Sequence, residues 1–209
     1  MSAFEPEVES LRRLVRGVRG ISLKPIGIGA VDAAVGATRA IAAARPARVI
    51  FVGTAGIYGR GKAATAAIGS VAVAGELFCV SMAALRGDGY LPGPMILRVE
   101  TSPELRLALA AHVPGEAPPP GVACPMAITR SESLGLRIAA ATGASLENLE
   151  TFSVARAAKA AGVPFGAVLG IANRVAPIGH EQWLRHHREA SRAACDLVAR
   201  FLELAPAAS

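Results

Sequence analysis

ENLETFSVARAAKAAGVPFGAVLGIANRV, residues 147–175, is the stretch that decides the fold class of this chain. Residues 150–161 have the composition of a helix, and residues 165–172 form an apolar run typical of a strand buried on both faces of a parallel sheet. Glu150 opens the helix, and Asn173 directly follows the strand. We therefore expect an acid and an amide at the carboxyl edge of a parallel sheet.

The same alternation of helix and strand extends outward over the rest of the chain. Helices are predicted at 5–16, 30–44, 102–112, 131–142, 150–161 and 181–204. Strands are predicted at 21–28, 48–52, 95–100, 122–128 and 165–172, with one or two more within 68–82, and GTAG (53–56) is expected to turn the chain. This order predicts a three-layer α/β/α fold with a mixed, mostly parallel central sheet, formed by one domain over residues 1–209.

Composition and charge limit the partners. The net charge is +6, but the arginine runs at 12–19 and 185–200 contain no interleaved aromatics that could stack on bases, so no nucleic-acid partner is predicted. Between Lys62 and Arg86 the only charge is Glu76, yet glycines and alternating residues favour strands over a membrane span. The chain starts without an apolar segment, which predicts a cytoplasmic protein.

Metal and cofactor motifs are weak. The three cysteines form no CxxC pair, and the four histidines have no metal-binding spacing, with His180, His186 and His187 expected on the exposed side of the last helix. GIYGRGKA (56–63) is a near-match to a phosphate loop, but it ends in Ala63 where a magnesium-binding hydroxyl is required. Gly27-Ile28-Gly29 lacks the third glycine of a dinucleotide motif. We predict no metal and no cofactor, and keep a nucleotide-binding loop as an alternative.

Four segments together resemble one superfamily. They are SAFEPEVESLRR (2–13), GIGAVDAAVGATRAIAAARPARVIFVGTAG (27–56), ENLET (147–151) and VPFGAVLGIANRV (163–175). Their motifs and order resemble the nucleoside phosphorylase and nucleosidase superfamily. VGTAGIYG (52–59), RGDGYLP (86–92) and NRVAPIGHEQW (173–183) are most similar to its futalosine hydrolases. That superfamily has a strand before its first acidic segment, whereas here only Met1 and Ser2 precede Ala3, so we expect either that this strand is absent or that the start of the chain is truncated.

The resemblance implies roles for particular residues. Glu7 corresponds to the acid that activates the attacking water, and Glu150 to the acid that binds the ribose hydroxyls. Asn173 corresponds to the residue that holds the purine. The resemblance also implies that the substrate is lined by Thr54, Ala55, Gly56, Thr129 and Leu149. From position alone, Glu7 and Glu150 could equally be favourable charges at helix starts, and Asn173 a turn residue.

The implied activity is hydrolysis of the N-glycosidic bond of a 6-oxopurine nucleoside. A carboxylate near the sugar stabilises its developing positive charge, and a second one can take a proton from water. An amide NH₂ can donate to the acceptors of a 6-oxopurine, which favours hypoxanthine over adenine as the leaving group. The resemblance points to futalosine as the substrate, in menaquinone biosynthesis, and to a homodimer or larger homo-oligomer.

Two other functions remain open. The chain could be another purine nucleosidase or phosphorylase, of the inosine or methylthioadenosine type, although Leu169, where relatives often have an arginine, favours water over phosphate. The other alternative is a non-catalytic nucleotide-binding protein that uses the loop around Lys62.

Overall fold

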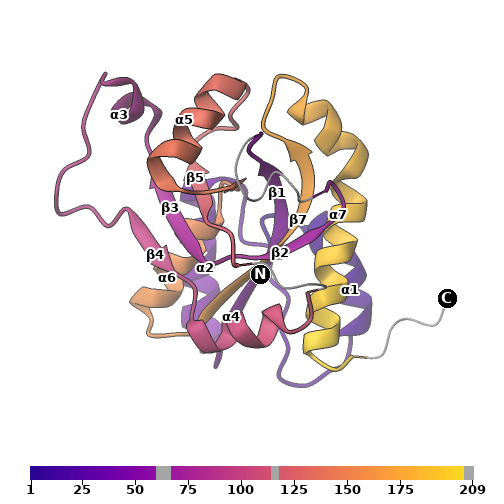
Figure 1. The fold of residues 1–209 in the computed structure, drawn as a ribbon. Helices are drawn as coiled ribbons and strands as arrows, with labels where there is room; N and C mark the ends of the chain where they lie inside the picture. Colours follow the sequence, from indigo (N-terminus) through magenta and orange to yellow (C-terminus); the bar gives the residue numbers. More distant parts are fainter. Residues whose placement is uncertain (60–66, 114–117, 205–209) are drawn as a thin grey trace.

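A mixed seven-stranded sheet forms the middle layer of the computed structural model, which describes residues 1–59, 67–113 and 118–204 (Figure 1). The strands are β1 (Val49–Ile57), β2 (Val71–Val73), β3 (Glu76–Val80), β4 (Arg98–Glu100), β5 (Val122–Pro125), β6 (Leu146–Glu147) and β7 (Phe165–Arg174). Their order is β2-β7-β1-β6-β5-β3-β4. Three of the six neighbouring pairs are parallel, namely β1 with β7, β5 with β6 and β3 with β5.

Helices cover both faces of this sheet. They are the 3₁₀ helix η1 (Glu5–Val8) and the α-helices α1 (Glu9–Leu14), α2 (Ala30–Ala44), α3 (Met82–Arg86), α4 (Pro103–Ala110), α5 (Glu132–Thr142), α6 (Thr151–Ala160) and α7 (Gly179–Phe201). One apolar cluster joins α2 and α6 to the sheet, and a second joins α1, α4 and α7 to it. The three-layer α/β/α architecture with a mixed sheet is confirmed.

Helix α7 packs unusually close to β7, because a glycine faces it. A Cβ atom on Gly170 would lie 2.0 Å from the carbonyl oxygen of Ala190 in α7. Only glycine permits this separation. The contact sets the position of α7 relative to β7, which run side by side (Figure 1). The backbone of α7 in turn positions the side chains near its start.

Two sequence expectations about β1 and its neighbour are wrong. GTAG does not turn the chain: residues 53–56 belong to β1, which is paired with β7 on one side and with β6 on the other at its end. Residues 21–28 form no strand and contribute only an isolated bridge between Pro25 and Ser2, since proline has no N–H to donate to a ladder. The short elements α3 and β6 were not predicted from the sequence.

Residues 1–3 lie beside β1 and pair with it. Val52 N–H donates to Met1 O at 2.8 Å, and Met1 N donates to Ile50 O at 2.7 Å. On the other side, Ile26 N–H donates to Ser2 O at 3.0 Å. These contacts anchor the chain just before η1, although no full strand precedes it.

A bulge interrupts the pairing of β1 with β7. Ala55 lies opposite Ile171, but the next residue of β1, Gly56, lies opposite Asn173. Ala172 is therefore the extra residue of the bulge. Strand β7 continues through Asn173 to Arg174, two residues beyond the predicted run.

Within the described segments, no helix combines the length and the apolar character that a bilayer crossing requires.

Candidate active site

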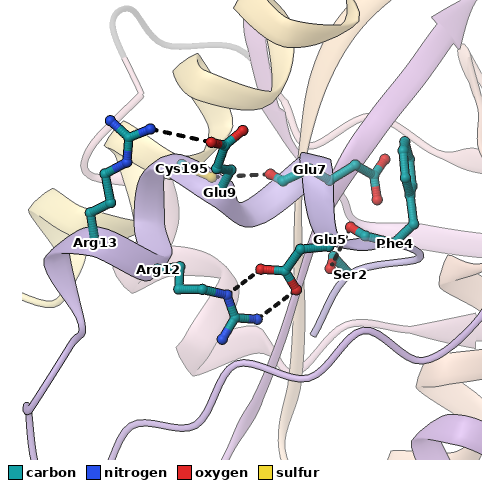
Figure 2. A network of polar contacts seen from close by, with 8 residues as sticks. All are labelled: Ser2, Phe4, Glu5, Glu7, Glu9, Arg12, Arg13 and Cys195. Carbon is teal, nitrogen blue, oxygen red and sulfur yellow. Dashed lines mark hydrogen bonds and ion pairs between the residues drawn. The ribbon is translucent and has the colours of Figure 1, made fainter.

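Glu7 is the only one of three neighbouring glutamates that turns inward (Figure 2). Glu5 pairs with Arg12, and Glu9 with Arg13 at 3.2 Å, both on the surface. The Glu7 side chain is 4% exposed. Its Oε2 accepts from Ala3 N–H at 3.1 Å, and its Oε1 accepts from Thr54 N–H at 3.1 Å and Thr54 Oγ1–H at 3.3 Å. The 3₁₀ geometry of η1 thus directs Glu7 at the end of β1.

Burial, followed by the negative charge of Glu150, raises the pKa of Glu7 from 4.5 to about 7. The hydrogen bonds from Thr54 and Ala3 stabilise the carboxylate and partly oppose this rise. A carboxyl group that titrates near neutral pH can both take and release a proton at that pH. Glu7 therefore has the properties of a general acid or base.

Glu150 lies at the N-cap of α6 and is 5% exposed. Its Oε1 accepts from Gly29 N–H at 2.8 Å, at the N-cap of α2, where the positive end of the helix dipole favours an anion. Burial nevertheless raises the pKa of Glu150, and the Gly29 hydrogen bond is the largest opposing effect. Two buried acids from distant parts of the chain therefore lie within electrostatic range of each other.

Asn148 links these acids to β1 and was not singled out in the sequence. Its Nδ2 donates to Thr54 O at 3.0 Å, while its Oδ1 accepts from Glu150 N–H at 2.9 Å and from Thr151 N–H at 2.8 Å. One amide thus holds the Thr54 main chain and caps the start of α6. Asn148 fixes the position of Glu150 relative to β1.

Asn173 lies beside Gly56, near the carboxyl end of β7. A Cβ atom on Gly56 would come within 3.0 Å of Asn173 Nδ2, so the two residues are in direct contact. Gly56 is two residues along β1 from Thr54, which is roughly 7 Å in an extended strand. Asn173 Nδ2 donates to Arg174 O at 3.0 Å, and the side chain is only half-buried, which leaves it able to contact a ligand.

The other residues predicted for the site differ in burial and in what they contact. Thr54 contacts Glu7, whereas the Ala55 side chain packs into the core beside Ile171. Leu149 is half-buried between Asn148 and Glu150. Leu169 is fully buried in the sheet core.

Thr129 leads to a third buried acid, Glu147, which the sequence analysis did not select. Thr129 N–H donates to Glu147 Oε1 at 2.9 Å, and Tyr58 Oη–H donates to Oε2 at 2.8 Å. Burial raises the pKa of Glu147, and the Thr129 hydrogen bonds oppose the rise. Because Glu147 lies opposite Gly56 in the register of β6 and β1, it flanks Gly56 on the side away from Asn173.

The histidines of α7 are only partly exposed, contrary to the sequence expectation. His180 is exposed, but His187 stacks on Trp183 with ring centroids 4.3 Å apart. Over the described part of the chain, no group of three or more His, Cys, Asp or Glu side chains could hold a metal ion. Lys62, which belongs to the predicted phosphate loop, lies outside the described residues.

Comparison with known proteins supports a single family. The family model described as "Phosphorylase superfamily" matches residues 11–203. A comparison with curated proteins finds no match.

Solved structures with the same fold include three bacterial proteins. The 5′-methylthioadenosine/S-adenosylhomocysteine nucleosidase of Neisseria meningitidis has a TM-score of 0.80 at 20% identity, covering 97% of this chain and 96% of its own. The futalosine hydrolase of Helicobacter pylori strain 26695 has a TM-score of 0.81 at 18% identity, with coverages of 97% and 95%. The S-adenosylhomocysteine nucleosidase of Streptococcus pyogenes has a TM-score of 0.82 at 19% identity, with coverages of 97% and 94%.

These likenesses establish the fold, and the family model covers nearly the whole chain. The superfamily inferred from the sequence motifs is therefore confirmed. The chain belongs to the phosphorylase superfamily.

Proposed function

We propose that this protein hydrolyses the N-glycosidic bond of a purine nucleoside, and that its substrate is a 6-oxopurine nucleoside of the futalosine type. The observation that carries the proposal is the meeting of two buried acids, Glu7 and Glu150, at the end of β1 that also contacts Asn173. The solved relatives named above are nucleosidases and a futalosine hydrolase, which is consistent with this chemistry.

In the proposed reaction, Glu7 accepts a proton from water while the water oxygen attacks the anomeric carbon of the sugar. The bond from that carbon to the purine nitrogen breaks, and the purine leaves with the bonding electron pair. Glu150 binds the ribose hydroxyls, and its charge stabilises the cationic sugar more strongly in the transition state than in the ground state. The pKa of Glu7, about 7, is suited to a base that acts near neutral pH.

Asn173 is the proposed purine-binding residue. Its NH₂ group can donate to the ring nitrogen that gains charge as the base leaves, and to the oxygen of a 6-oxopurine. An adenine presents a donor at the corresponding position, where a carboxylate would fit better. We therefore assign hypoxanthine as the preferred leaving group, and futalosine as the preferred nucleoside.

The test is to incubate the protein with futalosine, inosine and methylthioadenosine and to measure the free base. We expect fastest release from futalosine, unchanged by added phosphate. Release that requires phosphate would instead identify a phosphorylase. The absence of base release from all three nucleosides would overturn the proposal. The variant Glu7→Gln serves as the inactive control.

We further propose that one domain over residues 1–209 acts in the cytoplasm as a homodimer or larger homo-oligomer. Val31 and Val35 in α2, and Ile28 just before its N-cap, are 63%, 53% and 63% exposed and form an apolar stripe close to Gly29. Exposed apolar stripes of this kind are typical of subunit contacts. Light scattering coupled to size-exclusion chromatography would test the oligomer, and a monomer at micromolar concentration would contradict it.

A further inference from the structure

Trp183 is the only tryptophan of the chain. It is connected to Glu7, the proposed general base, through the hydroxyl group of Thr54. It lies in the second turn of α7, and its Nε1 donates to Thr54 Oγ1 at 3.1 Å. Thr54 Oγ1 in turn lies 3.3 Å from Glu7 Oε1. The three side chains form a continuous chain of hydrogen bonds across β1.

The chemistry of these groups fixes the direction of the chain. An indole N–H can only donate, so the Thr54 hydroxyl must be the acceptor in its contact with Trp183. A threonine hydroxyl has a single proton, and with Trp183 as its donor that proton is free to point at Glu7. Thr54 therefore offers two donors to the same carboxylate oxygen, its hydroxyl and its main-chain N–H.

We propose that Trp183 is a positioning residue for the reaction: it holds the Thr54 hydroxyl as a donor to Glu7, and so fixes the orientation and charge state of that carboxylate. This role rests on the proposed function for its effect on rate, whereas the hydrogen-bond chain can be tested without substrate.

The indole ring is held on more than one side. His187 stacks on it at 4.3 Å between centroids with an interplanar angle of 15°, and His180 lies nearly parallel at 6.0 Å. Phe4, at the N-cap of η1, contacts it at 6.3 Å. Aromatic contacts at these separations restrict ring rotation, so the Nε1–H direction is set by its neighbours.

Other titratable groups also face Glu7, and their effects must be distinguished from that of Glu7 in any pH titration that is followed at Trp183. They are Glu150, Cys195, the Met1 amino group and, through the indole, His180 and His187. Burial raises the pKa of the Cys195 thiol, whose Sγ–H contacts the Glu7 carbonyl oxygen at 3.2 Å. Burial lowers the pKa of His187. His187 is therefore expected to titrate below Glu7, and a variant at this position can remove its effect.

The first test is a pH titration followed by NMR, in which the single tryptophan gives a single indole N–H resonance. In a background that carries both His180→Phe and His187→Phe, we expect that resonance to shift with a midpoint near pH 7, where Glu7 titrates. Adding Glu7→Gln is expected to abolish this step. A step that persists without Glu7, or an indole proton that exchanges as fast as an exposed one, would overturn the proposal.

The second test is kinetic and uses Trp183→Phe, which keeps an aromatic ring but removes the donor. We expect kcat to fall about 3- to 10-fold with little change in KM, since one hydrogen bond to a charged group is weakened. The midpoint of the pH–rate profile should rise by roughly 0.5 pH unit, because the pKa of a carboxyl group such as Glu7 rises when a hydrogen-bond donor to its ionised form is weakened.

A double-variant cycle separates this effect from a general loss of structure. Thr54→Val should reproduce the change in pH midpoint, and combining it with Trp183→Phe should add no further change, because both act through the same hydroxyl. Thr142→Val removes a hydroxyl whose hydrogen bonds, to Ile138 O and from Ala144 N–H, lie at the C-terminal end of α5, and it should leave the profile unchanged. An unchanged midpoint in Trp183→Phe, or additive effects in the double variant, would overturn the proposal. If the unaltered protein releases no free purine, the proposed function is wrong. The NMR titration still decides whether the hydrogen-bond chain from Trp183 through Thr54 to Glu7 exists.

Discussion

The replacement Glu7→Gln should change how the stability of the protein depends on pH. The pKa of Glu7 is raised by burial from 4.5 to about 7 in the folded state. Between these two values the unfolded chain has released the proton while the folded protein still holds it. The free energy of unfolding therefore falls as pH rises through this interval, and the loss is complete above pH 7.

The size of the effect follows from the two pKa values. A difference of about 2.5 between folded and unfolded states corresponds to roughly 3 kcal/mol, at 1.36 kcal/mol per pKa unit. Glutamine does not ionise, so this contribution disappears in the variant. The new amide NH₂ faces either Ala3 N–H or Thr54 N–H, donor against donor, which costs about 1–3 kcal/mol at every pH. As the pH rises from 4.5 to 8, the free energy of unfolding of the variant should accordingly increase by roughly 3 kcal/mol relative to that of the unaltered protein.

Urea unfolding of both proteins at several pH values between 5 and 8 measures this difference directly. Glu5→Gln is the matched control, because it removes a glutamate from the same turn that is exposed and paired with Arg12. Its stability relative to the unaltered protein is expected to change far less, since exposed ion pairs contribute little. A difference between Glu7→Gln and the unaltered protein that stays constant to within about 1 kcal/mol over this range would refute the reasoning.

Three further changes test the site and the packing. Glu150→Gln should lower kcat/KM for base release about 100-fold or more, because a charge near the cationic sugar is lost; a smaller loss than tenfold would remove Glu150 from its assigned role. Asn173→Asp should shift the ratio of rates on inosine and methylthioadenosine toward the adenine nucleoside, and an unchanged ratio would show that the amide does not read the base. Gly36→Ala should cost more than about 2 kcal/mol in thermal unfolding, since its Cβ would lie 2.0 Å from Ile26 O, whereas Gly93→Ala, which meets nothing within 4 Å, should be nearly neutral.

The sequence predicted the parts of the fold that depend on local patterns. Helix α2 was predicted with the observed bounds, and β7 was predicted from its apolar run. The prediction of a turn at residues 53–56 failed because glycines favour turns locally, while pairing with β7 along the whole segment, and with β6 at Gly56, keeps these residues extended. That pairing joins residues more than 90 positions apart, which no local pattern contains.

The candidate site could be predicted where its residues lie in short sequence motifs. Glu7, Glu150 and Asn173 were selected from short segments, and the structure places all three around the end of β1. Asn148 and Trp183 were missed because their roles lie in contacts with Thr54, 94 and 129 positions away. A tryptophan or asparagine that acts through another side chain has no signature in its own neighbourhood.

The bulge between β1 and β7 makes the orientation of Asn173 depend on the number of residues in β7. Since successive residues of a strand point to opposite faces, the extra residue Ala172 decides which face receives the amide of Asn173. Deleting that one alanine would keep every side chain named in the mechanism, yet would move Asn173 by one position along β7, directly after Ile171, and so change its place in the alternation of faces. In a search for proteins with the same specificity, an alignment gap at this position should therefore count as heavily as a lost carboxylate.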